Sequence, residues 1–162
     1  MFNGKLETKV NYHQNFMLKA LKLAERAMDE EEVPVGAIIV KNERIIGRGY
    51  NQTERLKDPT AHAEMIAISA AASTLSNKYL NSCTLYVTLE PCPMCAGALI
   101  WSKIDRIVFG ALDERAGSCG TVFNLTNSDK LNHNIEIIQG VLESDSAYLL
   151  KEFFKSKRKN QP

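Results

Sequence analysis

Hydrophobic residues recur at helical spacing in the first part of the chain. Between residues 12 and 32 they lie three or four positions apart, and charged side chains fill the opposite face. The apolar positions are Phe16, Met17, Ala20, Leu21, Ala24, Ala27 and Met28. This pattern predicts an amphipathic helix whose apolar residues belong to the core.

Short apolar runs bounded by turn residues predict five strands. These runs cover residues 33–40, 45–51, 84–89, 106–110 and 135–141. Only a short polar turn separates the first two runs, so we expect them to pair as a hairpin.

Further helices are expected between and after these strands. Asp58 is a predicted N-cap and Pro59 a first helical residue, opening a helix that runs through residue 72. A helix over residues 92–102 joins the third and fourth strands as a short βαβ unit, which should be parallel and right-handed. A closing helix covers residues 143–157. Its expected inward positions are Ala147, Leu150 and Phe154.

This order of elements predicts an α/β protein with a five-stranded mixed sheet in a three-layer α/β/α arrangement. The chain has no internal repeat, low-complexity segment or linker, so residues 1–162 are expected to form one domain. The stretch 111–134 shows little periodicity, and connections of this length often bind ligands. One short helical turn is expected within it, at residues 122–125.

Two short motifs supply metal-binding side chains. The first is His62-Ala-Glu64, and the second is Pro91-Cys-Pro-Met-Cys95. His62, Cys92 and Cys95 give one imidazole and two thiolates, whereas a closed structural zinc site needs four protein ligands. A catalytic zinc keeps its fourth position for water, and Glu64 is then left to handle protons. The pattern H-x-E followed by P-C-x-x-C is typical of zinc deaminases that act on nucleobases.

The spacing of these residues predicts a site at two helix ends. Residues two apart lie about 200° apart around a helix, so His62 and Glu64 can share a site only at the end of their helix. Cys92 and Cys95 lie three apart at the start of a helix that follows a strand, where open α/β sheets bind ligands. A helix N-terminus also favours thiolate over thiol.

The expected chemistry is hydrolytic deamination. Bound zinc lowers the pKa of water from 15.7 to about 7. Glu64 is the expected catalytic residue: it would accept that proton, deliver it to a ring nitrogen of the base and help to protonate the departing ammonia. The main-chain N–H of Ala63 is a candidate partner for the base.

The cysteines leave two other interpretations open. A C-x-x-C pair also occurs in redox sites and zinc ribbons, but a redox site gives His62 and Glu64 no role. A structural zinc would require Cys83 or Cys119 as a fourth ligand. Cys83 precedes the strand whose far end carries Cys92, which holds it roughly 20 Å away. Cys119 lies in the irregular stretch and can reach the site.

Composition bears on nucleic-acid binding and on the cellular location of the protein. The net charge is +1, so the chain as a whole is not an electrostatic binder of nucleic acid. The longest apolar runs are far shorter than a membrane span, and residues 1–10 lack the apolar segment of a signal peptide. We therefore expect a cytoplasmic protein with reduced cysteines and no membrane partner. Lysine and arginine gather in the C-terminal tail, about 155–162.

Segments outside the zinc motif narrow the family. They are residues 32–37 (EVPVGA), 49–51 (GYN), 58–64 (DPTAHAE), 85–92 (LYVTLEPC), 95–98 (CAGA), 131–133 (LNH) and 153–154 (FF). With them, nearly the whole chain resembles bacterial tRNA-specific adenosine deaminases of the cytidine deaminase superfamily. The resemblance implies a cytidine-deaminase-like fold with one Zn²⁺ per subunit.

The same resemblance implies a substrate and a partner. The substrate would be the wobble adenosine in a tRNA anticodon stem-loop, most typically of an arginine tRNA, converted to inosine. The protein would be a homodimer in which each active site borrows residues from the partner. By position, Asn51 matches a base-contacting asparagine and Asp113 an acidic residue near the RNA. Lys157 and Arg158 in the basic tail match a region that can contact the stem.

Two alternatives follow from the same residues. Pro93 between the cysteines and Trp101 on the same predicted helix resemble guanine deaminases, which act on a free base and need no RNA-binding surface. A non-catalytic RNA-binding module stabilised by zinc is the second alternative, and it requires Cys119 in the metal shell.

Overall fold

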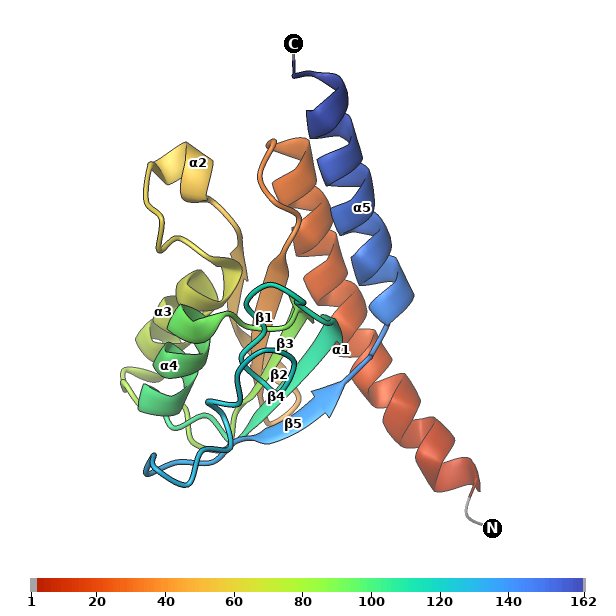
Figure 1. The fold of residues 1–162 in the computed structure, drawn as a ribbon. Coiled ribbons are helices and arrows are strands. Elements are labelled where there is room, and N and C mark those ends of the chain that lie inside the picture. Colours follow the sequence, from red (N-terminus) through yellow and green to blue (C-terminus); the bar gives the residue numbers. More distant parts are fainter. Residues whose placement is uncertain (1–2, 162) are drawn as a thin grey trace.

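The computed structural model describes the backbone of residues 3–161 and the side chains of residues 11–161. Within that range helices surround one sheet of five strands (Figure 1). The elements are α1 (Asn3–Asp29), β1 (Gly36–Lys41), β2 (Arg44–Tyr50), α2 (Thr53–Leu56), α3 (Ala63–Leu75), β3 (Thr84–Leu89), α4 (Pro93–Trp101), β4 (Arg106–Ala111), β5 (Glu136–Gln139) and α5 (Glu143–Lys159). None of these helices combines the length and apolar character that crossing a bilayer requires.

The sheet is mixed, as the sequence predicts. Its strand order is β2-β1-β3-β4-β5. β1 is antiparallel to β2, with which it forms the expected hairpin, and antiparallel to β3. β3, β4 and β5 run parallel to one another, so β3-α4-β4 is the expected parallel βαβ unit.

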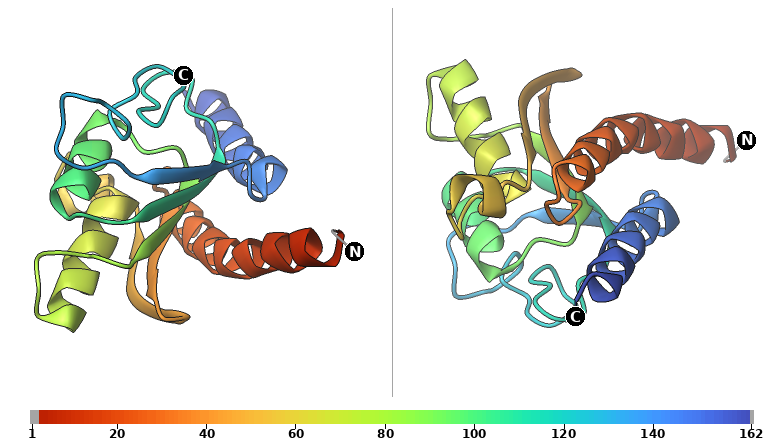
Figure 2. Two further views of the ribbon diagram at one scale, coloured as in Figure 1. Left: turned by 90° about the horizontal axis from the view of Figure 1, so that it is seen from below. Right: turned by 90° about the horizontal axis from the view of Figure 1, so that it is seen from above.

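Helices cover both faces of the sheet, which confirms the three-layer arrangement. α1 and α5 lie on one face, and α3 and α4 lie on the other (Figures 1 and 2). Alternate residues of the central strands enter the two cores, because successive strand side chains point to opposite faces. The α1 side includes Met17, Ala20, Leu21, Ile38, Val40, Tyr86 and Val108. The α3–α4 side includes Ala37, Ile39, Ala67, Leu85, Val87, Leu99, Ile107 and Phe109.

The start of α3 differs from the prediction. Asp58 does not cap a helix, because its Oδ1 accepts hydrogen bonds from the N–H and hydroxyl of Thr60 at 2.8 and 2.7 Å. This is a local side-chain turn, which competes with helix formation at an aspartate. The helix begins at Ala63, and His62 is its N-cap in an extended conformation.

Two other expectations are wrong in detail. Phe153, rather than Phe154, is the buried aromatic residue of α5, and Ala147 is exposed. The inward face of α5 therefore includes Ser146 and Phe153, each one residue before an expected position. The expected helical turn at residues 122–125 does not form. Its place is taken by an isolated bridge between Cys119 and Asn124.

Two glycines allow α3 to lie directly on β2. A Cβ at Gly49 would overlap the carbonyl oxygen of Ala63 and lie 2.8 Å from the nitrogen of Ala67. A Cβ at Gly47 would lie 2.5 Å from the carbonyl oxygen of Ala67. Any side chain at these positions would push α3, and the His62–Glu64 turn with it, away from the sheet.

We predict that Gly49→Ala lowers the free energy of unfolding by about 1–3 kcal/mol, because the added methyl group overpacks the contact between α3 and β2. Urea denaturation measures the change. Arg48→Ala is the control, since Arg48 is the neighbouring residue and its side chain is exposed. We expect that variant to stay within about 0.5 kcal/mol of the parent. Equal stability of the two variants would contradict the close-packing argument.

Candidate active site

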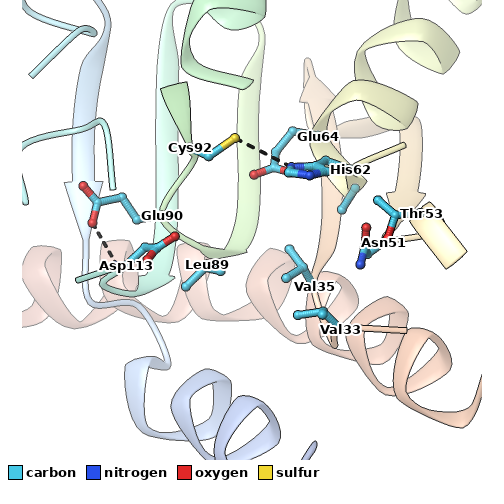
Figure 3. Close-up of a pocket in the computed structure, with 11 residues that line it drawn as sticks. Val33, Val35, Asn51, Thr53, His62, Glu64, Leu89, Glu90, Cys92 and Asp113 are labelled. Carbon is cyan, nitrogen blue, oxygen red and sulfur yellow. Dashed lines mark hydrogen bonds between the residues drawn. The ribbon is translucent and has the colours of Figure 1, made fainter. Parts of the chain in front are cut away.

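Three potential metal-binding atoms meet where two helices begin. His62 Nδ1 lies 3.7 Å from Cys92 Sγ (Figure 3). It lies 3.6 Å from Cys95 Sγ. All three donor atoms lie within 4.8 Å of one another. His62 and Cys92 are the N-cap residues of α3 and α4, and neither uses its side chain to cap its helix. These side chains are therefore available to a ligand.

The electrostatics of this group favour a cation. Hydrogen bonds from Cys95 and His62 lower the pKa of Cys92 to about 4. The same Cys92–Cys95 contact raises the pKa of Cys95, and the contact with Cys92 raises that of His62. The sulfur atoms thus compete for one proton, a conflict that a divalent cation removes because it stabilises thiolate. One imidazole and two sulfur donors are a ligand set that zinc prefers.

Glu64 lies beside this group without belonging to it. Its side chain is only 4% exposed, and burial raises the pKa of its carboxyl group to about 7. A carboxyl group with that pKa can both accept and release a proton near neutral pH. This is the property required of the general acid–base residue predicted from the sequence.

A cavity of about 220 Å³ opens beside the three donors. This is smaller than the roughly 300–1,000 Å³ typical of small-molecule pockets, so it suits one planar ring with the rest of a substrate outside. Its walls come from the ends of strands, from the segments that adjoin them and from the starts of α2 and α3 (Figure 3). The lining residues are Val33, Val35, Asn51, Thr53, His62, Ala63, Glu64, Leu89, Glu90, Cys92 and Asp113.

Three residues expected to contact substrate lie on this cavity: Asn51, Ala63 and Asp113. Asn51 is 7% exposed, and its Oδ1 has no hydrogen-bond partner within the described residues. A buried oxygen without a partner costs free energy, so it is a site for a donor on a ligand. Ala63 is the first residue of α3, where the main-chain N–H has no partner within the helix.

Lys157 and Arg158 lie away from the cavity, on the last turn of α5. Lys157 Nζ is 3.9 Å from Glu31 Oε1, and Arg158 Nε donates to the carbonyl oxygen of Phe154 at 3.4 Å. Both side chains are exposed. The C-terminal end of α5 lies at the same end of the molecule as α2, which carries Thr53 of the cavity wall (Figure 1).

The other cysteines and histidines lie outside the donor group. Among the described residues, the group contains neither Cys83 nor Cys119. Cys83 is fully buried in the core, and burial raises the pKa of Cys119 to about 12. His133 Nε2 is 2.6 Å from the carbonyl oxygen of Ile104, which holds the end of the long connection. A four-ligand structural site that uses Cys119 therefore gains no support.

Sequence reasoning missed Thr53 and Glu90 on the cavity wall. Thr53 begins α2, a single turn too short to give a periodic signal. Glu90 follows the buried strand β3 and is itself only 1% exposed. Glu90 stands in the sequence between an apolar strand and the two metal-binding cysteines, which is an unusual position for a carboxylate. This position was the sequence signal that could have identified it.

Sequence comparison identifies the family. Residues 10–111 match the cytidine and deoxycytidylate deaminase zinc-binding region. A tRNA-specific adenosine deaminase of Aquifex aeolicus (strain VF5) is 50% identical over 145 residues, which cover 90% of this chain and 95% of that protein. The similarity therefore extends beyond the zinc-binding region to most of the chain.

Similar solved structures include other deaminases. One, from studies of A-to-I editing by tRNA:A34 deaminases at the wobble position of transfer RNA, has a TM-score of 0.81 and 39% identity. It covers 84% of this chain and 99% of that one. A guanine deaminase from Nitrosomonas europaea has a TM-score of 0.73 and 25% identity, covering 85% and 81%. This chain belongs to the cytidine and deoxycytidylate deaminase family, and its cofactor is zinc.

Proposed function

We propose that this protein is a zinc-dependent hydrolase that converts the wobble adenosine of a tRNA anticodon loop to inosine. The observation that carries the proposal is the cavity in which Asn51 Oδ1, the Ala63 N–H and the Glu64 carboxyl group surround one space beside the metal donors. The similarity to tRNA-specific adenosine deaminases favours this substrate over free guanine, for which the structural relative is only 25% identical.

We propose that His62, Cys92 and Cys95 hold the zinc ion, one per subunit. When bound, zinc lowers the pKa of water to about 7 and thereby provides a nucleophile at neutral pH. The sulfur and imidazole donors supply three ligands, so one position is left for that water.

Glu64 carries the protons in this mechanism. It accepts a proton from the attacking water and delivers it to N1 of adenine as the oxygen adds to C6. It then takes the remaining proton of the added hydroxyl group and gives it to the amino group, which leaves as ammonia while the C6 carbonyl forms. Water and adenosine give inosine and ammonia, and Glu64 returns to its starting state. Burial suits the residue to this work because it holds the carboxyl pKa at about 7.

Asn51 and Ala63 orient the base. The unpartnered Asn51 Oδ1 is an acceptor, and the N–H of Ala63 is a donor. A ring held between these groups can lie flat against the apolar walls formed by Val33, Val35 and Leu89. Asp113 lies near the start of the irregular 111–134 connection and lines the cavity. It is proposed to contact the nucleotides next to the base.

The small cavity suits a single-stranded substrate. A base in an anticodon loop can be splayed out and inserted without opening a duplex. The remainder of the RNA then lies outside, where Lys157 and Arg158 can contact phosphates of the stem. The family resemblance makes an arginine tRNA the first substrate to test, and a cytoplasmic location follows from such a substrate.

We also propose that the protein forms a homodimer through α4. Met94, Gly97, Ala98 and Trp101 lie at helical spacing, and each is at least partly exposed. Trp101 is 79% exposed, and α4 contains no charged residue. Such an apolar face marks a protein interface, and a second copy is the partner that the family implies. A single monomeric species in analytical ultracentrifugation would contradict this proposal.

We predict that Cys92→Ser and Cys95→Ser lose zinc, because a hydroxyl group is a much poorer ligand for zinc than a thiolate. Metal analysis of the purified variants measures zinc per chain. Cys119→Ser is the matched control and should keep about one zinc per chain, as the parent does. Loss of zinc from the control would instead favour the structural site with four ligands.

We predict that Glu64→Ala keeps zinc and lowers the rate of inosine formation by about 10²–10⁴-fold, the contribution typical of acid–base catalysis. The assay uses an arginine tRNA transcript with adenosine at the wobble position, and inosine is measured directly. An active Glu64→Ala variant would contradict the mechanism. No conversion by folded, zinc-loaded parent protein, together with turnover of free guanine, would support the guanine deaminase alternative.

We predict that replacing both Lys157 and Arg158 with alanine weakens tRNA binding and lowers its dependence on salt. Each lost phosphate contact should reduce the slope of log K against log salt concentration by about 1. Lys41→Ala with Arg44→Ala is the matched control, because these residues lie at the opposite end of the β1–β2 hairpin from Asn51. Identical slopes for both double variants would remove α5 from the RNA-binding surface.

A further inference from the structure

Glu90 is a buried acid that the mechanism above does not use. It follows β3 directly, precedes Cys92 by two residues and is 1% exposed. Burying a carboxylate is unfavourable unless other groups satisfy its oxygens. In this protein those groups come from the connection after β4, which is the segment that also carries Asp113.

Both oxygens of Glu90 are occupied by this segment. Oε2 accepts from the N–H of Asp113 at 3.1 Å and from the hydroxyl of Thr121 at 2.6 Å. Oε1 accepts from the N–H of Cys119 at 3.0 Å and from the N–H of Thr121 at 3.2 Å. Residues 113–121 thus fold around one carboxylate, as backbone N–H groups do around a bound anion.

Two further contacts fix this segment to the metal-binding side of the cavity. The N–H of Ser118 donates to the carbonyl oxygen of Pro91 at 2.9 Å. Gly117 packs so closely that a Cβ there would overlap Glu90 Oε2 and lie 2.5 Å from the carbonyl oxygen of Asp113. The segment therefore has no room to shift toward Glu90.

The arrangement joins two walls of the cavity. Cys92 and Asp113 both line the cavity, and Glu90, two residues before Cys92, is hydrogen-bonded to Asp113 (Figure 3). Because four donors already occupy the oxygens of Glu90, the residue acts on a substrate only through the segment that it holds. The segment contains no helix or named strand. Asp113 accepts hydrogen bonds from the N–H groups of residues 115–117 of its own turn, and its N–H donates to Glu90, which fixes that turn to the end of β3.

We propose that Glu90 is a positioning residue that holds Asp113 on the cavity wall and thereby sets the affinity for the RNA loop, not the rate of deamination. The substrate in this statement rests on the proposed function. The anchoring of residues 113–121 by Glu90 does not, and it can be tested without RNA.

The main variant is Glu90→Gln, which keeps the shape of the side chain. A glutamine nitrogen cannot accept a hydrogen bond, so one of the two donor pairs loses its acceptor. We expect KM for a wobble-adenosine stem-loop to rise about tenfold, with kcat and zinc content unchanged. Gly117→Ala, which pushes the segment away from an intact Glu90, should raise KM in the same way. Glu114→Gln, an exposed acid in the same segment, is the control and should leave both constants unchanged.

A double variant separates positioning from general structural support. If Glu90 acts through Asp113, then Asp113→Ala should raise KM in the parent protein and add less than about twofold in the Glu90→Gln background. Independent, multiplicative effects would overturn the proposal. It would also be overturned by an unchanged KM, or by loss of zinc or kcat at an unchanged KM, since these assign Glu90 to the metal site alone.

Hydrogen–deuterium exchange supplies the test that needs no substrate. Exchange of the amides in residues 113–121 should be at least about tenfold faster in Glu90→Gln than in the parent and in Glu114→Gln. Exchange in α3 should not change. Unchanged exchange in residues 113–121 would overturn the anchoring role. Faster exchange in a protein that proves inactive on tRNA would contradict the proposed function and leave the anchoring role standing.

Discussion

The close contact between α3 and β2 determines where the active-site groups lie. Gly47 and Gly49 leave no side chain between strand and helix, so the backbone of α3 rests on β2. Asn51 follows Gly49 by two residues, and Ala63 begins the helix that Gly49 touches. A helix raised by even one methyl group would separate Asn51 from the His62–Glu64 turn. The distance between the base-orienting groups and the metal donors is therefore set by packing in the core.

Two buried carboxylates hold the short helix α2 and the irregular segment 113–121 beside the cavity. Glu32 is fully buried and accepts from the N–H groups of Glu54 at 3.1 Å and Arg55 at 2.7 Å, which are orphan donors in the first turn of α2. Glu90 does the same for residues 113–121. In both places a carboxylate replaces water as the acceptor for backbone N–H groups. A short helix and an irregular connection are thereby hydrogen-bonded to residues that adjoin the strands of the sheet.

The sequence predicts the parts of this protein that depend on local patterns. The bounds of β3 agree with the structure, because its apolar run ends at a clear boundary before Pro91. The predicted start of α3 was wrong. The Asp58 side chain accepts hydrogen bonds from Thr60 and forms a local turn there, and it does not cap a helix. The role of Glu90 could not be predicted, since its partners lie more than twenty residues away in a segment without periodicity. Long-range hydrogen bonds of this kind leave no period in the sequence.

The H-x-E motif can form one site because it lies at the N-terminus of α3. His62 is the N-cap, with an extended backbone, and Glu64 is the second residue of α3. Inside a helix these side chains would diverge by about 200°. At the first turn the cap residue has not yet entered the helix, so the imidazole, the N–H of Ala63 and the carboxyl group can all reach one cavity. Three consecutive residues thus provide a metal donor, a hydrogen-bond donor and a proton carrier. Moving the helix start to Asp58 would place His62 and Glu64 within the helix and destroy that convergence.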